Sequence, residues 1–268
     1  MLKVFLSSLL LLASLPGKSQ VLKQPIPNKT VVLTFDDGVA SHYSYVAPLL
    51  LEYGFGGTFF VCEFPPNFSD STLYMNWRQI QQLDKMGFEV ANHTQHHAPV
   101  GKLSEEEILQ EINYIEEKCD SLGIKAPLGF AYPGYSMSET VLEVLSKKDY
   151  LLARAGGERV YQPLEDHPYL IPSWATEPGN EKDIMEALKQ AKDGNIVILT
   201  FHGVPDLEHP WVSTPPDMFK RYLEFLKENQ YNVISLKQLT SYIDFKEARN
   251  QFKADLNKRL KKDRKSVV

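Results

Sequence analysis

The chain has 268 residues, of which 43% are apolar and 24% are charged, and it carries a formal net charge of −5 at pH 7. This is the composition of an ordinary globular protein without repeats or low-complexity tracts, and one catalytic domain fits the length. Because nucleic acid is polyanionic, the negative net charge disfavours it as a partner.

The first 19 residues have the pattern of a secretory signal peptide. Lys3 precedes an apolar run of about a dozen residues, and the small residues Gly17 and Ser19 follow it. The run is shorter than the roughly 20 residues of a membrane-spanning helix, so we expect cleavage near Ser19 and no integral membrane span afterwards. An uncleaved anchor is the alternative. Outside the cytoplasm Cys62 and Cys119 are free to form a disulfide, or they remain two separate buried thiols.

Short apolar strands alternate with helical stretches between residues 30 and 243. The expected strands are 31–35, 57–62, 88–92, 129–132, 150–155, 196–201 and 233–235, and the expected helices are 43–53, 77–86, 104–122, 138–148, 181–192 and 216–229. This alternation predicts parallel strands wrapped by helices, as an open sheet or a barrel. We expect a single domain over residues 20–245, followed by a basic helical tail over residues 246–268.

Polar residues gather where the expected strands end. Asp36-Asp37 follow the first strand, and His93 and His97 follow the third; Tyr132-Pro133 and His202 follow two later strands. In α/β barrels, the carboxyl ends of the strands carry the chemistry. The coincidence therefore predicts one functional site built from these residues.

The adjacent carboxylates Asp36 and Asp37 point to a divalent metal centre, and hence to a hydrolase. Burying a carboxylate costs several kcal/mol unless a cation or a proton compensates. One carboxylate would bind the metal, and the other would take a proton from a water that the metal acidifies. His93 and His97 are four residues apart, which on a helical turn places both rings on one face; His96 is an alternative ligand. His202, at the end of a buried strand, suits a general acid.

These motifs resemble those of the polysaccharide deacetylase family, which is carbohydrate esterase family 4 and shares the nodulation-deacetylase (NodB) homology domain. The likeness covers residues 28–245 and rests on Thr-Phe-Asp-Asp-Gly at 34–38, His-Thr-Gln-His-His at 93–97 and Gly-Thr-Phe-Phe-Val at 57–61. It implies a distorted, incomplete (β/α)7 barrel with an open groove for a glycan chain. It also favours export from a bacterium, to the periplasm or the medium.

The resemblance also implies roles for individual residues. Asp36 would be the catalytic base and His202 the acid. Asp37, His93 and His97 would hold a divalent metal, most often Zn²⁺, and this implies that His96 lies outside the ligand set. Thr94 would brace the loop that carries the two histidines.

Two segments depart from the family pattern. Ala131 stands where the family usually has an arginine that orients the base, in Gly129-Phe-Ala-Tyr-Pro-Gly-Tyr135. Arg154, on the next expected strand, either supplies the missing guanidinium or forms a surface salt bridge. The remainder of the segment, Tyr132, Pro133 and Gly134, would line the acetyl site, with a backbone N–H near Gly134 stabilising the oxyanion.

The second departure lies in the fourth motif, which is reduced to Pro-Ser-Trp at 172–174. Trp174 would wall the acetyl pocket or pack near His202, or it would simply pack in the core. Trp211 and Tyr135 are candidates for stacking on a sugar ring. The sequence thus predicts an exported, metal-dependent hydrolase that releases acetate from an N-acetylated polysaccharide or oligosaccharide. The alternatives are an O-deacetylase of an acetylated xylan-like polysaccharide, a non-catalytic glycan-binding protein on the same scaffold, and a metal-free amide hydrolase.

Overall fold

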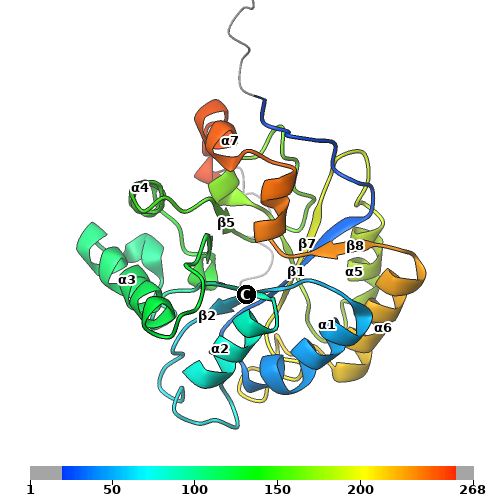
Figure 1. The fold of residues 1–268 in the computed structure, drawn as a ribbon, viewed down its shortest axis with the longest axis horizontal. Helices are drawn as coiled ribbons and strands as arrows, with labels where there is room; N and C mark the ends of the chain where they lie inside the picture. The colour runs from blue at the N-terminus through cyan, green and yellow to red at the C-terminus, as the bar shows by residue number, and fades with distance from the viewer. Residues whose placement is uncertain (1–19, 258–268) are drawn as a thin grey trace, which may run out of the picture.

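The protein folds into a sheet of eight parallel strands surrounded by helices, as seen in a computed structural model that describes residues 20–257 (Figure 1). The expected signal peptide and residues 258–268 of the expected basic tail lie outside the described residues. The strands are β1 (Thr30–Phe35), β2 (Thr58–Val61), β3 (Glu89–Asn92), β4 (Gly129–Ala131), β5 (Leu152–Arg154), β6 (Trp174–Ala175), β7 (Val197–Phe201) and β8 (Asn232–Ile234).

Seven of these strands curl into an incomplete barrel, in the order β5-β4-β3-β2-β1-β7-β6. Strands β5 and β6 do not pair as neighbours in this order; a parallel bridge joins Arg154 of β5 to Ile171, shortly before β6. The eighth strand, β8, pairs with the first half of β1, while β2 pairs with its second half. The expectation of a distorted, incomplete (β/α)7 barrel is thus confirmed.

The helices lie outside the strands (Figure 1). They are α1 (Ala47–Tyr53), α2 (Trp77–Lys85), α3 (Glu105–Ser121), α4 (Glu139–Lys147), α5 (Glu181–Leu188), α6 (Pro216–Glu228) and α7 (Phe245–Gln251). The expected helix at 43–53 is broken into a π-helical turn, η1 (His42–Val46), followed by α1. Helices α2 and α3 begin with capping boxes in which Asn76 and Ser104 accept backbone N–H groups and thereby fix where the helices start.

Strand periodicity decides which residues face the barrel interior. Outward residues such as Val31, Leu33, Phe59 and Leu199 pack under the helices in one core cluster. A second cluster fills the interior with the alternate residues, Val32, Phe60, Ala91, Ala131, Leu152 and Ile198. Because successive side chains alternate across a strand, Asp36, His93, Arg154 and His202 continue the inward rows to the carboxyl ends of β1, β3, β5 and β7.

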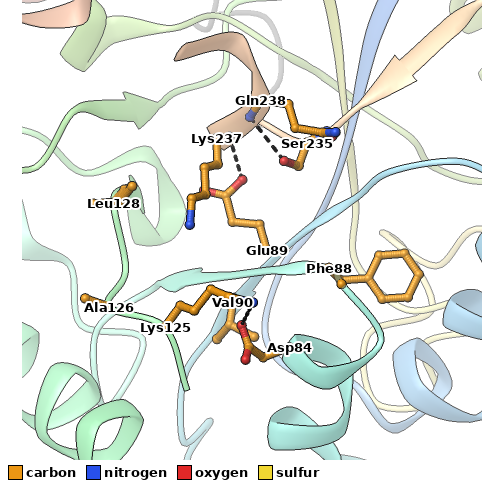
Figure 2. A pocket seen from close by; sticks show the side chains of 11 residues that line it. Asp84, Phe88, Glu89, Val90, Lys125, Ala126, Leu128, Ser235, Lys237 and Gln238 are labelled. Atoms are coloured by element: carbon orange, nitrogen blue, oxygen red, sulfur yellow. Dashed lines mark hydrogen bonds and ion pairs between the residues drawn. The ribbon is translucent and has the colours of Figure 1, made fainter. Parts of the chain in front are cut away.

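The opposite end of the barrel is closed by the C-terminal elements and holds a pocket of about 200 Å³ (Figure 2). There the buried Glu89 of β3 accepts hydrogen bonds from the hydroxyl of Thr58 and the backbone N–H of Lys237. Lys237 begins the 3₁₀ helix η5 (Lys237–Ser241), so one carboxylate joins β2, β3 and η5. Helix α7 packs Phe245 and Ala248 into the interior cluster, so the body of the protein continues beyond residue 244.

One strand lacks a counterpart among the expected strands. The strand β6 has only two residues, too few to show an alternating pattern. Helix α7 has seven residues and lies at the start of the expected basic helical tail. No helix within residues 20–257 is long and apolar enough to cross a membrane. Cys62 and Cys119 are both buried and unpaired.

Candidate active site

A cavity of about 240 Å³ opens at the carboxyl ends of the strands. Most of the residues that the sequence singled out line it: Asp36, Asp37, His93, His97, Tyr132, Gly134, Tyr135, His202 and Trp211. Phe64, His209 and Val212 line it as well. Residues from distant parts of the chain therefore meet at one place, because parallel strands bring their carboxyl ends to the same edge.

Three side chains in this cavity present ligand atoms to a common point. Oδ1 of Asp37 lies 3.3 Å from Nε2 of His93 and 3.4 Å from Nε2 of His97. The three ligand atoms lie within 4.8 Å of one another. A carboxylate with two imidazoles is a donor set typical of zinc sites.

The hydrogen bonds of His93 favour a cation at this point. Its Nδ1 lies 2.9 Å from the carbonyl oxygen of Ala131, and because a carbonyl can only accept, Nδ1 carries the proton. In the neutral ring, Nε2 is then a bare lone pair that faces the carboxylate of Asp37. Two acceptors in contact repel each other unless a cation lies between them, and a proton fixed on the far ring nitrogen is typical of metal-bound histidine.

The ionisation of the other two donors also suits a metal. Burial raises the pKa of Asp37, but a hydrogen bond from His93 and the positive charge of the His202, His97 and His93 rings in their protonated forms outweigh burial and lower the pKa overall, so the carboxylate is charged at neutral pH. Burial lowers the pKa of His97 to about 4, so its ring is neutral and offers a lone pair. Metal ligands must be deprotonated in this way.

The segment that joins His93 to His97 is an irregular loop and not the helical turn that we expected. Thr94 and His97 adopt positive φ angles of 67° and 51°, which fold the chain back over the site. The side chain of Asn92 accepts the N–H of Thr94, and Oγ1 of Thr94 accepts the N–H of Ala98. These local hydrogen bonds replace those of a helix, so the helical turn that we expected from the four-residue spacing does not form.

His96, the alternative ligand, points away from the cavity. Its Nδ1 lies 2.9 Å from Oε1 of Glu111 on α3, and about half of its side chain is exposed, 52%. The left-handed turn at Thr94 aims His97 inward and His96 outward. His96 therefore lies outside the three-donor set.

The second carboxylate, Asp36, is held by Arg154. Nη2 of Arg154 donates to Oδ2 of Asp36, and the arginine is completely buried. Its guanidinium lies over the rings of Phe60 and Tyr135, at 5.3 and 5.7 Å from their centroids. The other oxygen of Asp36, Oδ1, is buried and has no hydrogen-bond partner among the described residues.

The position of Arg154 accounts for the alanine at position 131. Ala131 and Arg154 are register partners on the neighbouring strands β4 and β5. Both side chains face the barrel interior, and the small side chain at 131 leaves space for the guanidinium that arrives from the next strand. Of the two alternatives for Arg154, the structure thus places it beside the base and not in a surface salt bridge.

His202 lies at the end of β7 and lines the same cavity. Its Nδ1 is buried and makes no hydrogen bond with any residue in the described part of the chain. Its backbone carbonyl accepts a hydrogen bond from Nε2 of His42, a fully buried residue of η1. Nothing in our reading of the sequence singled out His42.

The aromatic candidates divide between the cavity and the core. Trp211 lines the cavity and is 66% exposed. Trp174 is buried in the helix-facing core, next to Leu199 of β7, and does not line the cavity. Strand β6 directs the side chain of Trp174 outward, so Trp174 packs in the core and does not wall the cavity. Pro133 is buried beside Tyr132 and Gly134, in the 3₁₀ turn η3 (Pro133–Tyr135), where the N–H of Tyr135 is bound by the carbonyl of Tyr132.

Phe64 and His209 are the cavity residues that the sequence reading missed. The ring of Phe64 lies tilted beside those of His97 and His209, with ring centroids 4.7 and 5.1 Å away. Nδ1 of His209 lies 3.5 Å from Oδ2 of the buried Asp206. Phe64 follows β2 closely, so the same rule of strand ends, applied to the second strand, would have found it.

Comparisons with known proteins agree with this arrangement. The sequence matches the model of the family described as polysaccharide deacetylase over residues 23–153. A peptidoglycan-N-acetylglucosamine deacetylase from Bacillus cereus is 28% identical over 220 residues, which cover 81% of this chain and 92% of that protein. A bifunctional xylanase/deacetylase from Pseudobutyrivibrio xylanivorans is 26% identical, with 79% of this chain and 30% of that protein covered.

A solved structure shares the fold. It is the family 4 carbohydrate esterase domain of a multidomain xylanase from the hindgut metagenome of Trinervitermes trinervoides, with a TM-score of 0.57 and 23% identity. The match covers 80% of this chain and 90% of that one. In its motifs and sequence relatives this chain is similar to the polysaccharide deacetylase family, carbohydrate esterase family 4, and its barrel has the fold of a solved member.

Proposed function

We propose that this protein is a zinc-dependent deacetylase that hydrolyses the acetamido group of an N-acetylated glycan. The observation that carries the proposal is the pairing of a three-donor cluster, Asp37, His93 and His97, with a free carboxylate, Asp36, in one cavity. Both nitrogen donors and the carboxylate suit Zn²⁺. When bound, a divalent cation acidifies a water molecule and polarises the acetyl carbonyl.

The residues of the chain carry the proton transfers. Arg154 fixes one oxygen of Asp36 and leaves Oδ1 free to take a proton from the attacking water. The water oxygen bonds to the acetyl carbon, the C–N bond breaks, and His202 donates a proton to the departing amine. Acetate and a free amino sugar are the products. Gly134 lies at the cavity wall, where its segment can contact the acetyl oxygen.

The glycan would lie across the open cavity. Trp211 is largely exposed at its edge, and Tyr135 lines its wall, so both offer aromatic faces to a sugar ring. The peptidoglycan deacetylase named above supports an N-acetylated substrate. The deacetylase that is joined to a xylanase supports the alternative, an O-acetylated xylan.

Acetate release from N-acetylglucosamine oligomers, peptidoglycan and acetylxylan separates these readings. The enzyme would be assayed after chelation and again after zinc is restored. Zinc-dependent release from the first two substrates is the expected result. Release from acetylxylan alone would replace the N-deacetylase with an O-deacetylase, and unchanged release after chelation would refute the metal. Zinc binding without release from any substrate would favour a glycan-binding protein.

Asp36→Asn tests the base directly. An amide cannot take the proton, so we expect kcat to fall by about 10²- to 10⁴-fold. Zinc content should stay close to that of the wild type, because Asp36 is not one of the three donors. The melting temperature should fall, because the buried Arg154 keeps a hydrogen bond to the amide oxygen but loses its counter-charge. Full activity in the Asp36→Asn variant would remove Asp36 from the role of base.

We further propose that the protein is exported, on the pattern of residues 1–19. N-terminal sequencing of the protein recovered from the periplasm or the medium would test this. A mature chain that begins near residue 20 is expected, and recovery with Met1 in the cytoplasm would contradict it.

A further inference from the structure

The peptide that carries His202 is tied to the turn that follows Asp36 and Asp37. Oγ of Ser41 accepts the N–H of Val204 at 2.8 Å, and Nε2 of His42 bonds the carbonyl oxygen of His202. The two residues are consecutive, and they hold both sides of the short segment 202–204. We call this pair of hydrogen bonds the Ser41–His42 clamp.

His42 is built as a neutral hydrogen-bond donor. It is completely buried against the rings of Phe35 and Phe59, with centroids 5.5 and 5.7 Å away. Burial lowers the pKa of His42 to about 4, so the ring carries one proton at neutral pH. A carbonyl oxygen can only accept, so that proton lies on Nε2, and Nδ1 has no partner among the described residues.

The ring of His202 depends on its backbone for its orientation. A histidine with a chemical role usually has one ring nitrogen held by a carboxylate or a carbonyl, which fixes the direction of the other. His93 has such a partner in the carbonyl of Ala131. Nδ1 of His202 is buried without one in the described part of the chain. The direction of the His202 ring into the cavity must then be set by its backbone, which the clamp holds.

We propose that His42 is a positioning residue for His202, which it aims at the leaving nitrogen by fixing the carbonyl of that residue. The inference rests on the proposed deacetylase function, in which His202 protonates the amine. It assigns a role in the reaction to a buried side chain that does not line the cavity. Ser41 has the same role from the other side of the segment.

The test compares two leaving groups. An amine leaves only with a proton, whereas the phenolate of 4-nitrophenyl acetate leaves without one. His42→Leu removes the donor but keeps an apolar side chain, so kcat on an N-acetylglucosamine oligomer should fall by about 10²-fold, the usual contribution of a general acid. The rate on the aryl ester, the KM and the zinc content should change little. His42→Gln keeps an N–H donor and should recover much of the lost amide activity.

Further variants keep the result decisive if His42→Leu does not fold. Ser41→Ala removes one hydroxyl and should reduce amide hydrolysis more than ester hydrolysis. Ser44→Ala is the matched control, since Oγ of Ser44 bonds only the carbonyl of Ala40 on the same segment and is exposed. His202→Asn should show the same selectivity, and adding His42→Leu to it should lower amide turnover no further.

Two results would overturn the inference, and they differ from each other. Equal losses on the amide and the ester, or loss of zinc, in His42→Leu and Ser41→Ala would show a purely structural role. A wild-type enzyme that cleaves the ester but releases no acetate from any N-acetylated glycan would refute the proposed function. The role that we propose for His42 would then be refuted as well.

Discussion

At the scale of single residues, Asp36 contacts an arginine from the strand next to the one where the family resemblance places it. Arg154 of β5 occupies the space beside Ala131 of β4, its register partner, and bonds Asp36 across the barrel interior. In the proposed reaction a guanidinium beside Asp36 orients the base, and we expect that either strand can supply it. A motif that is searched along one strand therefore does not find an arginine that the next strand supplies.

Exchanging the two residues tests this reading. Arg154→Ala leaves the buried Asp36 without its partner, so we expect the free energy of unfolding to fall by about 3–5 kcal/mol and kcat to fall with it. Ala131→Arg in the same chain should restore part of both, because the new guanidinium enters the same space. Chemical denaturation and acetate release measure the two effects.

The control for the exchange is Ala131→Arg alone. Position 131 is completely buried, so a second guanidinium beside Arg154 should lower both stability and activity. If the double variant is no better than Arg154→Ala, the two positions are not equivalent and the exchange is excluded.

At the scale of elements, Glu89 links three of them at the end of the barrel opposite the active site. Its carboxylate joins β3 to Lys237 of η5 (Figure 2) and to Thr58 of β2. One oxygen of Glu89, Oε1, has no hydrogen-bond partner among the described residues. Burial raises the pKa of Glu89 in spite of its hydrogen bonds. The folded protein therefore holds the proton of Glu89 to a higher pH than the unfolded chain does.

This shift predicts a pH dependence of stability. Between the unfolded and the folded pKa of Glu89, the folded state binds more protons, so the contribution of this group is complete below the unfolded pKa and is lost as pH rises through the folded pKa. Glu89→Gln cannot titrate, and its amide oxygen can still accept from Thr58 and Lys237. We expect the melting temperature of the variant to match the wild type near pH 4 and to exceed it at pH 8.

Glu186→Gln provides the comparison for Glu89→Gln. Glu186 forms an exposed pair with Lys189 on α5, and its loss should leave the pH profile of the melting temperature unchanged. A Glu89→Gln profile parallel to that of the wild type would show that the carboxylate of Glu89 is ionised at the same pH in both states.

At the scale of the whole molecule, the metal site should contribute to stability because it draws on distant parts of the chain. Asp37 follows β1, and His93 and His97 follow β3, so the three donors come together only in the folded protein. A ligand that binds only the folded state stabilises it by about 2.7 kcal/mol at 100 times its Kd. For a domain of this size that raises the melting temperature by roughly 5–10 °C.

Thermal unfolding with and without zinc checks this prediction. Chelation should lower the melting temperature of the wild type, and added zinc should restore it in a concentration-dependent way. The variant His93→Ala/His97→Ala should show neither response, and His96→Ala should respond like the wild type. An equal response in His93→Ala/His97→Ala would place the zinc elsewhere.

The sequence by itself determined the alternation of strands and helices and the gathering of Asp36, Asp37, His93 and His202 at strand ends, while the barrel followed only from the family resemblance of its motifs. These are local signals, because hydrophobic period and motif spacing are written along the chain. Only the tertiary structure decided that Arg154 meets Asp36, that Trp174 faces the core and that His42 holds His202. Those contacts depend on strand register and on the direction that each side chain takes across the barrel. For residues far apart in sequence, register and direction are set only when the sheet closes.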